Sequence, residues 1–161
     1  MLKKIIFILF ITLSTYSFST NKNEKEFTIQ YSLKLDSDNK EIYRGATLTL
    51  SNNITSLTSW GVGTRILNND YSSSWVYLGI DIPIINKISI PINVGGGLKI
   101  KDLNFTDTNS GALDIILHGQ LGLEWEIDYS WDYLLYTTYN YNLLTKDSGS
   151  YFINLGIKYK Y

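Results

Sequence analysis

Apolar and polar residues alternate along most of the chain beyond its N-terminal region, in segments of about ten residues. In the first segment Phe27 and Ile29 fall on one face, while Thr28 and Gln30 fall on the other. A period of two is typical of a β-strand with one apolar face, and roughly ten residues suffice for a tilted strand to cross a bilayer. The pattern predicts eight strands, at residues 27–35, 42–50, 58–67, 74–84, 88–101, 112–125, 133–141 and 151–161.

The two faces of these predicted strands differ in how many charged residues they carry. The apolar face carries a single charge, Arg44, near one end of its segment. A charge at the middle of a lipid-facing barrel surface costs roughly 2–4 kcal/mol, so this near absence is typical of a surface that meets lipid. The opposite face carries the polar set that we expect inside the barrel: Arg65, Asp81, Lys99, Lys101, Asp114, His118, Glu124 and Lys158.

Opposite charges on the polar face recur at two levels, which predicts ion pairs across the interior. At one level Lys99 and Lys101 are expected to meet Asp114, with Arg65 nearby. At the other level the expected partners are Asp81 and Glu124 on one side and Lys158 and Lys160 on the other. Eight strands make a barrel just wide enough for side chains to fill, so the sequence favours a polar plug over an open channel.

Alternation alone also fits a soluble β-sandwich or a lipocalin-like ligand barrel, and the aromatic residues distinguish these alternatives. On the apolar face they gather near the two ends of the segments and leave an aliphatic zone between them. Membrane interfaces favour amphipathic rings at the headgroup level, whereas a soluble core has no reason to sort rings by height. The predicted girdle comprises Phe27, Trp60, Trp125 and Tyr133 at one end, with Tyr159 and Tyr161, and Tyr139, Tyr141 and Tyr151 at the other.

The connections between segments also differ at the two ends. Short turns follow the second, fourth and sixth segments, and these turns are expected to face the periplasm. The opposite end is expected to present loops 36–41, 67–74, 102–111 and 143–150 to the outside. Closing the sheet would remove the unpaired edge that hydrocarbon does not tolerate. The predicted fold is therefore all-β, an eight-stranded antiparallel up-and-down transmembrane β-barrel.

The N-terminal residues have the features of a secretory signal peptide. Lys3 and Lys4 precede the apolar run 5–13, and Ser17 and Ser19 occupy the small-residue positions before a cleavage site. The run is well short of the ~20 residues of a spanning helix, which disfavours an uncleaved anchor. The sequence predicts a signal peptide at residues 1–19 and an exported barrel domain at 20–161.

Composition narrows the functional classes further. The chain has 161 residues, enough for one domain, with 14 basic and 15 acidic residues and no basic block that would suggest nucleic acid. It contains no cysteine, which excludes disulfides, a lipoprotein anchor and cysteine-type zinc sites. No motif predicts a cofactor or a metal.

The final segment, NLGIKYKY, resembles the assembly signal of bacterial outer-membrane proteins at Asn154, Gly156, Tyr159 and Tyr161. Residues 26–161 resemble the OmpA/OmpX class of small barrels in architecture. The resemblance implies a Gram-negative outer-membrane location, contact with lipid and lipopolysaccharide, and periplasmic chaperones and the barrel-assembly machinery as partners during biogenesis. It also implies a structural or surface-interaction role, with an extracellular ligand at the outer loops.

An enzyme remains an alternative because His118 is the single histidine. Outer-membrane lipid A deacylases are similar barrels that carry a histidine, and a serine two residues later, on the lipid-facing surface. This chain departs from that pattern, because Gln120 takes the serine's place and His118 has inward parity. No catalytic residue is therefore expected. A narrow porin-like transport pathway is the other alternative.

Overall fold

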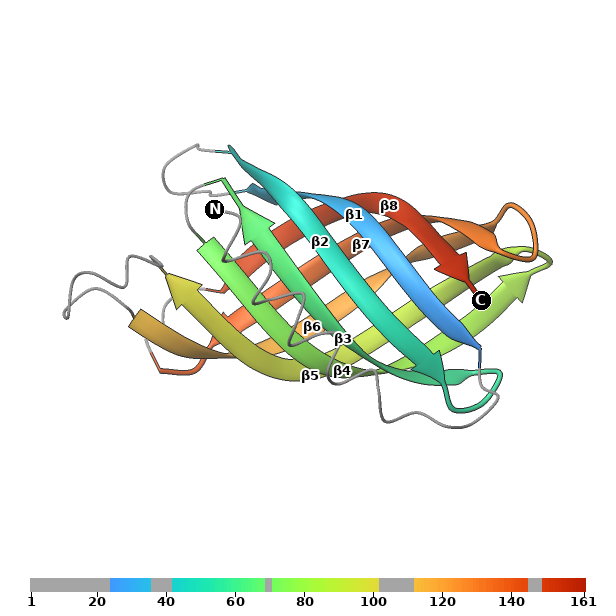
Figure 1. The fold of residues 1–161 in the computed structure, drawn as a ribbon, viewed down its shortest axis with the longest axis horizontal. Coiled ribbons are helices and arrows are strands. Elements are labelled where there is room, and N and C mark those ends of the chain that lie inside the picture. The colour runs from blue at the N-terminus through green and yellow to red at the C-terminus, as the bar shows by residue number, and fades with distance from the viewer. Residues whose placement is uncertain (1–23, 36–41, 69–70, 102–111, 145–148) are drawn as a thin grey trace.

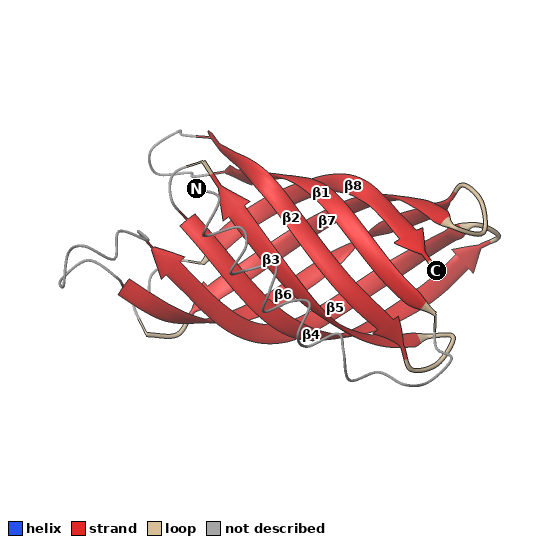
Figure 2. Ribbon diagram, viewed as in Figure 1, coloured by secondary structure: helices blue, strands red, loops and turns tan. Residues whose placement is uncertain are grey.

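The computed structural model describes residues 24–35, 42–68, 71–101, 112–144 and 149–161. Within them eight β-strands form one closed barrel in chain order (Figures 1 and 2). No helix in these ranges is long and apolar enough to cross a membrane. The strands are β1 (Lys25–Leu35), β2 (Ile42–Asn53), β3 (Thr58–Leu67), β4 (Tyr71–Ile85), β5 (Ile88–Lys101), β6 (Ala112–Glu126), β7 (Trp131–Asn142) and β8 (Ser150–Lys160). The predicted fold class is confirmed.

Every strand pairs antiparallel with its chain neighbours, and β8 closes the barrel against β1. The stagger of the strands follows from their registers. The path from Lys25 to its paired residue on β2, and from each residue to its partner on the next strand, returns to β1 at Leu35 and not at Lys25. The offset is therefore ten residues, from position 25 to position 35. This offset over eight strands corresponds to strands tilted by about 40° and to an interior that side chains fill.

The two ends of the barrel differ. One end, here called the turn end, holds the connections 54–57, 86–87 and 127–130. The start of β1 and the end of β8 also lie there. The turn end lies on the right in Figure 1. There the backbone N–H of Lys25 donates to the carbonyl of Tyr161 at 3.1 Å. Lys87, in the two-residue turn between β4 and β5, has a φ of 78°. The opposite end is called the loop end.

One predicted connection was wrong. Residues 67–74 were expected to form a loop after the predicted strand 58–67, but β4 already begins at Tyr71. The polar run 72–74 lacks the apolar alternation that marks a strand. Its backbone nevertheless continues the ladder, because Ser72 pairs with Ile66 on one side and Ile100 on the other.

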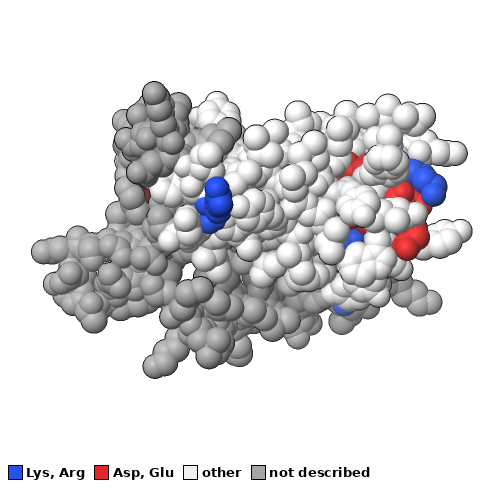
Figure 3. Space-filling model, turned by 90° about the horizontal axis from the view of Figure 1, so that it is seen from above, with Lys and Arg blue, Asp and Glu red and all other residues white. Residues whose placement is uncertain are grey.

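The distribution of apolar and polar residues is the reverse of that in a soluble domain. Hydroxyl and amide side chains such as Gln30, Ser32 and Asn154 are buried inside the barrel, at 1 % exposure or less. Outward aliphatic side chains such as Leu78 and Val94 expose more than half of their surface, at 63 % and 61 %. In Figure 3 the wall seen from above is almost free of charged residues between the two ends. This arrangement excludes the soluble sandwich and lipocalin-like alternatives, which require an apolar interior.

Candidate functional site: the filled lumen

Two large rings of β4, Trp75 and Tyr77, occupy the lumen with 3 % and 8 % exposure. Each ring lies between two glycines of the adjacent strands, Gly63 and Gly97 beside Trp75, and Gly61 and Gly95 beside Tyr77. A Cβ on Gly63 would come within 2.5 Å of the indole of Trp75. Gly61, Gly63, Gly95 and Gly97 therefore make room for the two rings that narrow the interior.

Arg65 lies fully buried near mid-lumen. Its Nε donates to Thr47 Oγ1 at 2.9 Å, and one terminal nitrogen donates to Asn154 Oδ1 at 3.2 Å. Its guanidinium carbon lies 3.8 Å from the ring centroid of Phe152. Neutral acceptors and an aromatic face thus solvate this charge. The sequence placed Arg65 near the level of Lys99 and Asp114, and the register links the three positions through Ser73.

His118 also faces the lumen and is 3 % exposed. Its Nδ1 lies 2.9 Å from Asn140 Oδ1, and its ring stacks on Trp75 with centroids 4.4 Å apart. Gln120 is buried as well, and its Oε1 accepts from Asn93 Nδ2 at 2.9 Å. A deacylase-like site would need residues 118 and 120 on the lipid face, and both point inside.

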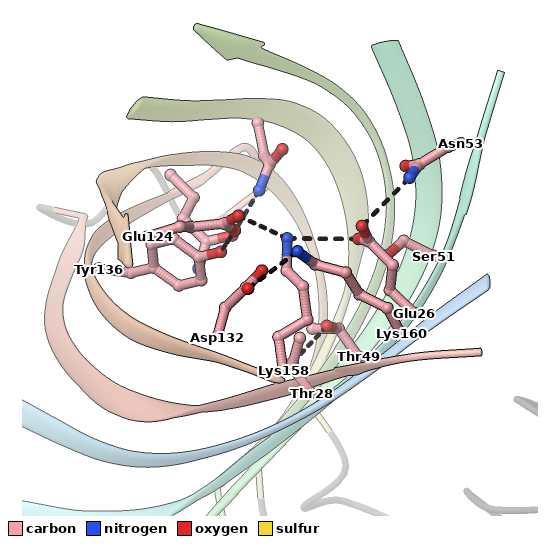
Figure 4. Close-up of polar contacts among 12 residues, drawn as sticks. Glu26, Thr28, Thr49, Ser51, Asn53, Glu124, Asp132, Tyr136, Lys158 and Lys160 are labelled. Carbon is pink, nitrogen blue, oxygen red and sulfur yellow. Dashed lines mark hydrogen bonds and ion pairs between the residues drawn. The ribbon is translucent and has the colours of Figure 1, made fainter. Parts of the chain in front are cut away.

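A charged layer crosses the lumen near the turn end (Figure 4). Lys158 Nζ lies 2.6 Å from Glu124 Oε2 and 3.3 Å from Glu26 Oε2, and all three side chains are nearly fully buried. Ser51 Oγ donates to Glu26 at 2.9 Å, and the hydroxyl of Tyr136 donates to Glu124. We call Glu26, Glu124 and Lys158 the charge layer. The expected Glu124–Lys158 pair is present.

A second ion pair joins Lys160 to Asp132 at 2.8 Å, close to the charge layer. Asp81 was expected to pair with Lys158 or Lys160, but it forms no ion pair within 4.0 Å among the described residues. Sequence reasoning missed Glu26 and Asp132. Glu26 lies one residue before the predicted strand, and Asp132 was assigned to a turn. Strand parity could have identified both, because each continues the inward series of its own strand.

A cavity of about 260 Å³ opens at the turn end and reaches the charge layer. A smaller void of about 10 Å³ lies deeper and shares Glu26, Asp81, Glu124 and Lys158 with the outer cavity. A void of this size holds about one water molecule. The charge layer therefore separates the open mouth from a tightly filled interior.

Lys99 and Asp114 lie toward the loop end of the lumen. Lys99 pairs in register with Asp114, as the sequence suggested for their level. Lys99 Nζ donates to Asn142 Oδ1 at 3.5 Å, and Asp114 Oδ1 accepts from the backbone of Leu144 at 3.0 Å. The Lys101 side chain lies outside the described set, although its backbone belongs to β5.

The predicted girdle residues lie on the outer surface. Trp125, Tyr133 and Tyr151 expose 60 %, 59 % and 65 %, and Tyr141 is exposed as well. The other members, Phe27, Trp60 and Tyr139, are half-buried. The sequence missed Trp131, which packs against Tyr159 with ring centroids 4.8 Å apart.

The four residues of the resembled assembly signal lie on both faces of β8. Asn154 and Gly156 face the lumen, whereas the rings of Tyr159 and Tyr161 stack outside with centroids 5.8 Å apart. A Cβ on Gly156 would clash with the backbone of β1. These residues thus contribute to packing in the finished barrel, whatever part they take in assembly.

Comparison with protein-family models gives no match, and comparison with curated protein sequences gives none either. Solved structures do match. The N-terminal β-barrel domain of Pseudomonas aeruginosa OprF has a TM-score of 0.69 at 9 % identity, covering 86 % of this chain and 98 % of that domain. Neisserial surface protein A has 0.65 at 13 % identity, with 88 % and 98 % covered. Yersinia pestis Ail has 0.60 at 14 % identity, with 88 % and 100 % covered.

These similarities define the class by fold. The chain is an eight-stranded antiparallel β-barrel of the type found in small outer-membrane proteins, the OmpA/OmpX-like architecture that its sequence resembled. At such low identity the comparison carries the fold and no residue role. Among the described residues no group of three or more His, Asp or Glu could hold a metal ion.

Proposed function

We propose that the chain is a non-enzymatic outer-membrane barrel with a structural role in the envelope. One observation carries this proposal: a closed barrel with an exposed aliphatic wall, aromatic rings toward both ends and a buried polar interior. Such a surface is stable in a bilayer, where burial of the wall in lipid favours insertion and closure leaves no backbone edge. The outer-membrane folds of OprF, NspA and Ail support the location.

The absence of catalysis is part of the proposal. The single histidine lies inside the barrel, stacked on Trp75, where a lipid substrate on the outer surface does not reach it. Residues 1–19, the proposed signal peptide, lie outside the described residues and would supply export. The C-terminal segment with Tyr159 and Tyr161 would supply recognition by the assembly machinery.

The experiment is heat-modifiable gel migration of membrane fractions from cells that express the full chain. We expect a compact unboiled form in the outer membrane. A chain ending at Lys158 should lose that form in cells, whereas the matched variant Tyr133→Ala, which removes an outward ring elsewhere, should keep it. If the full chain is recovered from the soluble periplasm, the proposal is wrong.

Refolding in detergent distinguishes a defect in recognition by the assembly machinery from a loss of barrel stability. The purified truncated chain should still fold in detergent micelles if its defect lies in recognition. If it also fails to fold in detergent, the C-terminal residues act through packing and the signal interpretation is contradicted, while the membrane proposal stands.

Surface interaction is the second candidate role. A structure of Ail contains the heparin analogue sucrose octasulfate. That observation supports the binding of an external ligand by a barrel of this fold. The test is calorimetric titration of the reconstituted chain with sucrose octasulfate. If millimolar ligand gives no heat of binding, sucrose octasulfate is excluded as a ligand of this chain.

A further inference from the structure

The β4–β5 hairpin extends past its neighbour at the turn end and exposes aliphatic side chains there. Thr58 begins β3 and pairs with Ile80, so residues 81–85 of β4 run beyond the end of β3. Ile84 exposes 54 % of its surface, and Ile85, which follows a register irregularity after Pro83 and lines the mouth cavity, exposes 64 %. Figure 1 shows the β4–β5 turn at the right-hand end of the barrel. Exposed to water, this apolar tip would be unfavourable.

The hairpin also lies beyond the level of the girdle ring on β3, whereas the girdle ring on β6, Trp125, pairs with Ile88 beside the turn. Trp60 pairs with Leu78, so Ile84 lies six residues further along β4 than the partner of that ring, from position 78 to position 84. With strands tilted by about 40°, this separation corresponds to a displacement on the order of 10 Å along the barrel axis. No aromatic residue occurs on the outward face of this hairpin within residues 80–92.

The apolar tip is continuous with the wall that faces lipid. Leu78, Ile80, Ile82 and Ile84 follow one another on the outward face of β4, and each is exposed. The inward residue between them, Asp81, is turned toward the mouth cavity. The first charged side chain at the tip is Lys87, and a lysine at such a position can place its amine at lipid phosphates.

The free edge of the hairpin is poorly suited to a partner strand. The N–H of Asp81 points toward β3 and donates to the carbonyl of Leu57 at 2.9 Å. Two residues later the same edge carries Pro83, which has no N–H to donate. An incoming strand would therefore lack a ladder bond at the centre of the exposed segment, whereas lipid needs none.

We propose that the β4–β5 hairpin is buried in the hydrocarbon of the turn-side leaflet, with Lys87 at its phospholipid headgroups. This inference rests on the proposed membrane location. With Trp60 at the headgroup level, as a girdle ring, Ile84 can reach the hydrocarbon of the same leaflet only if the barrel axis is inclined to the membrane normal. The hairpin is thus a lipid-contacting anchor that sets the lean of the barrel.

Site-directed spin labelling tests this inference, because the chain has no cysteine and any introduced cysteine is unique. Labels are placed in Ile84→Cys, in Leu135→Cys on the outward wall of β7, and in Tyr129→Cys, whose residue is 96 % exposed in the β6–β7 turn. Each variant is reconstituted in vesicles of phosphatidylethanolamine and phosphatidylglycerol. Relaxation by oxygen reports hydrocarbon, and relaxation by a neutral nickel chelate reports water.

We expect the label at 84 to resemble that at 135, with an oxygen-to-nickel ratio several-fold above that at 129. If 135 reports hydrocarbon but 84 reports water, the inference is overturned and the membrane proposal stands. If 84 is shielded from both reagents, protein covers the hairpin and the inference again fails. If 135 also reports water, the membrane proposal itself fails. Heat-modifiable migration of each labelled variant verifies that it is folded.

Discussion

Lys158 and Glu124 meet at 2.6 Å although β7 separates their strands, so their contact passes over the inner face of β7 and does not join adjacent strands. Glu26, on β1, lies 3.3 Å from the same ammonium group. One cation therefore serves two buried carboxylates from opposite directions. The pairing is complete only when β6, β8 and β1 hold their registers, and it links the closing seam of the barrel to β6.

Replacing Lys158 by methionine should destabilise the barrel by about 3–5 kcal/mol, because Glu26 and Glu124 would remain buried without a cation. Urea unfolding in detergent micelles, followed by gel migration, measures the loss. Lys160→Met is the matched control, since Lys160 forms one ion pair and its side chain is more exposed, at 21 %. Adding Glu26→Gln and Glu124→Gln to Lys158→Met should recover much of the loss. No recovery would mean that the lysine stem, and not its charge, stabilises the layer.

Two adjacent glycines of β5, Gly96 and Gly97, should differ in how much stability an added methyl group costs. A Cβ at Gly97 would lie 2.6 Å from Trp75 Cα, whereas the nearest atom to a Cβ at Gly96 is 3.6 Å away. Gly97→Ala should therefore cost about 1–3 kcal/mol through overpacking, and Gly96→Ala should stay within about 0.5 kcal/mol of the parent. Unfolding midpoints in urea compare the two. Equal losses would contradict the close approach of β4 to Gly97.

The period of two and the parity of each segment were enough to predict the barrel, because one lipid-facing wall imposes a strict alternation. The same parity placed Arg65, His118 and Lys158 inside. Which groups meet across the lumen depends on the stagger of all eight strands, and no single segment encodes that offset. For this reason Glu26 was missed as the second partner of Lys158, and the hydrogen bonds from Arg65 to Thr47 and Asn154 were not foreseen. Ser72 and Ser73 were misjudged because a strand in a closed wall can be polar where its neighbours supply the ladder.

The loss of stability caused by a lysine on the outer wall should depend on the depth of that position in the bilayer. Leu121 is 51 % exposed midway along the outward face of β6, and Leu121→Lys should cost roughly 2–4 kcal/mol in vesicles. Leu144, which is 62 % exposed beyond the end of β7, provides the control, since Leu144→Lys should cost about 0–1 kcal/mol there. Unfolding of vesicle-reconstituted protein measures both. Similar costs at the two positions would show that the wall around Leu121 does not meet hydrocarbon.

Ion passage should be blocked at two levels in series. The charge layer closes the lumen near the turn end, and Arg65 with Phe152 and Trp75 fills it further along. Because the narrowest remaining point limits a pore, Lys158→Ala or Arg65→Ala alone should leave planar-bilayer conductance at the level of the parent chain. The double variant should give resolvable steps, provided that gel migration shows it to be folded. Steps from Lys158→Ala alone would show that the charge layer is the sole barrier, which would favour the transport alternative.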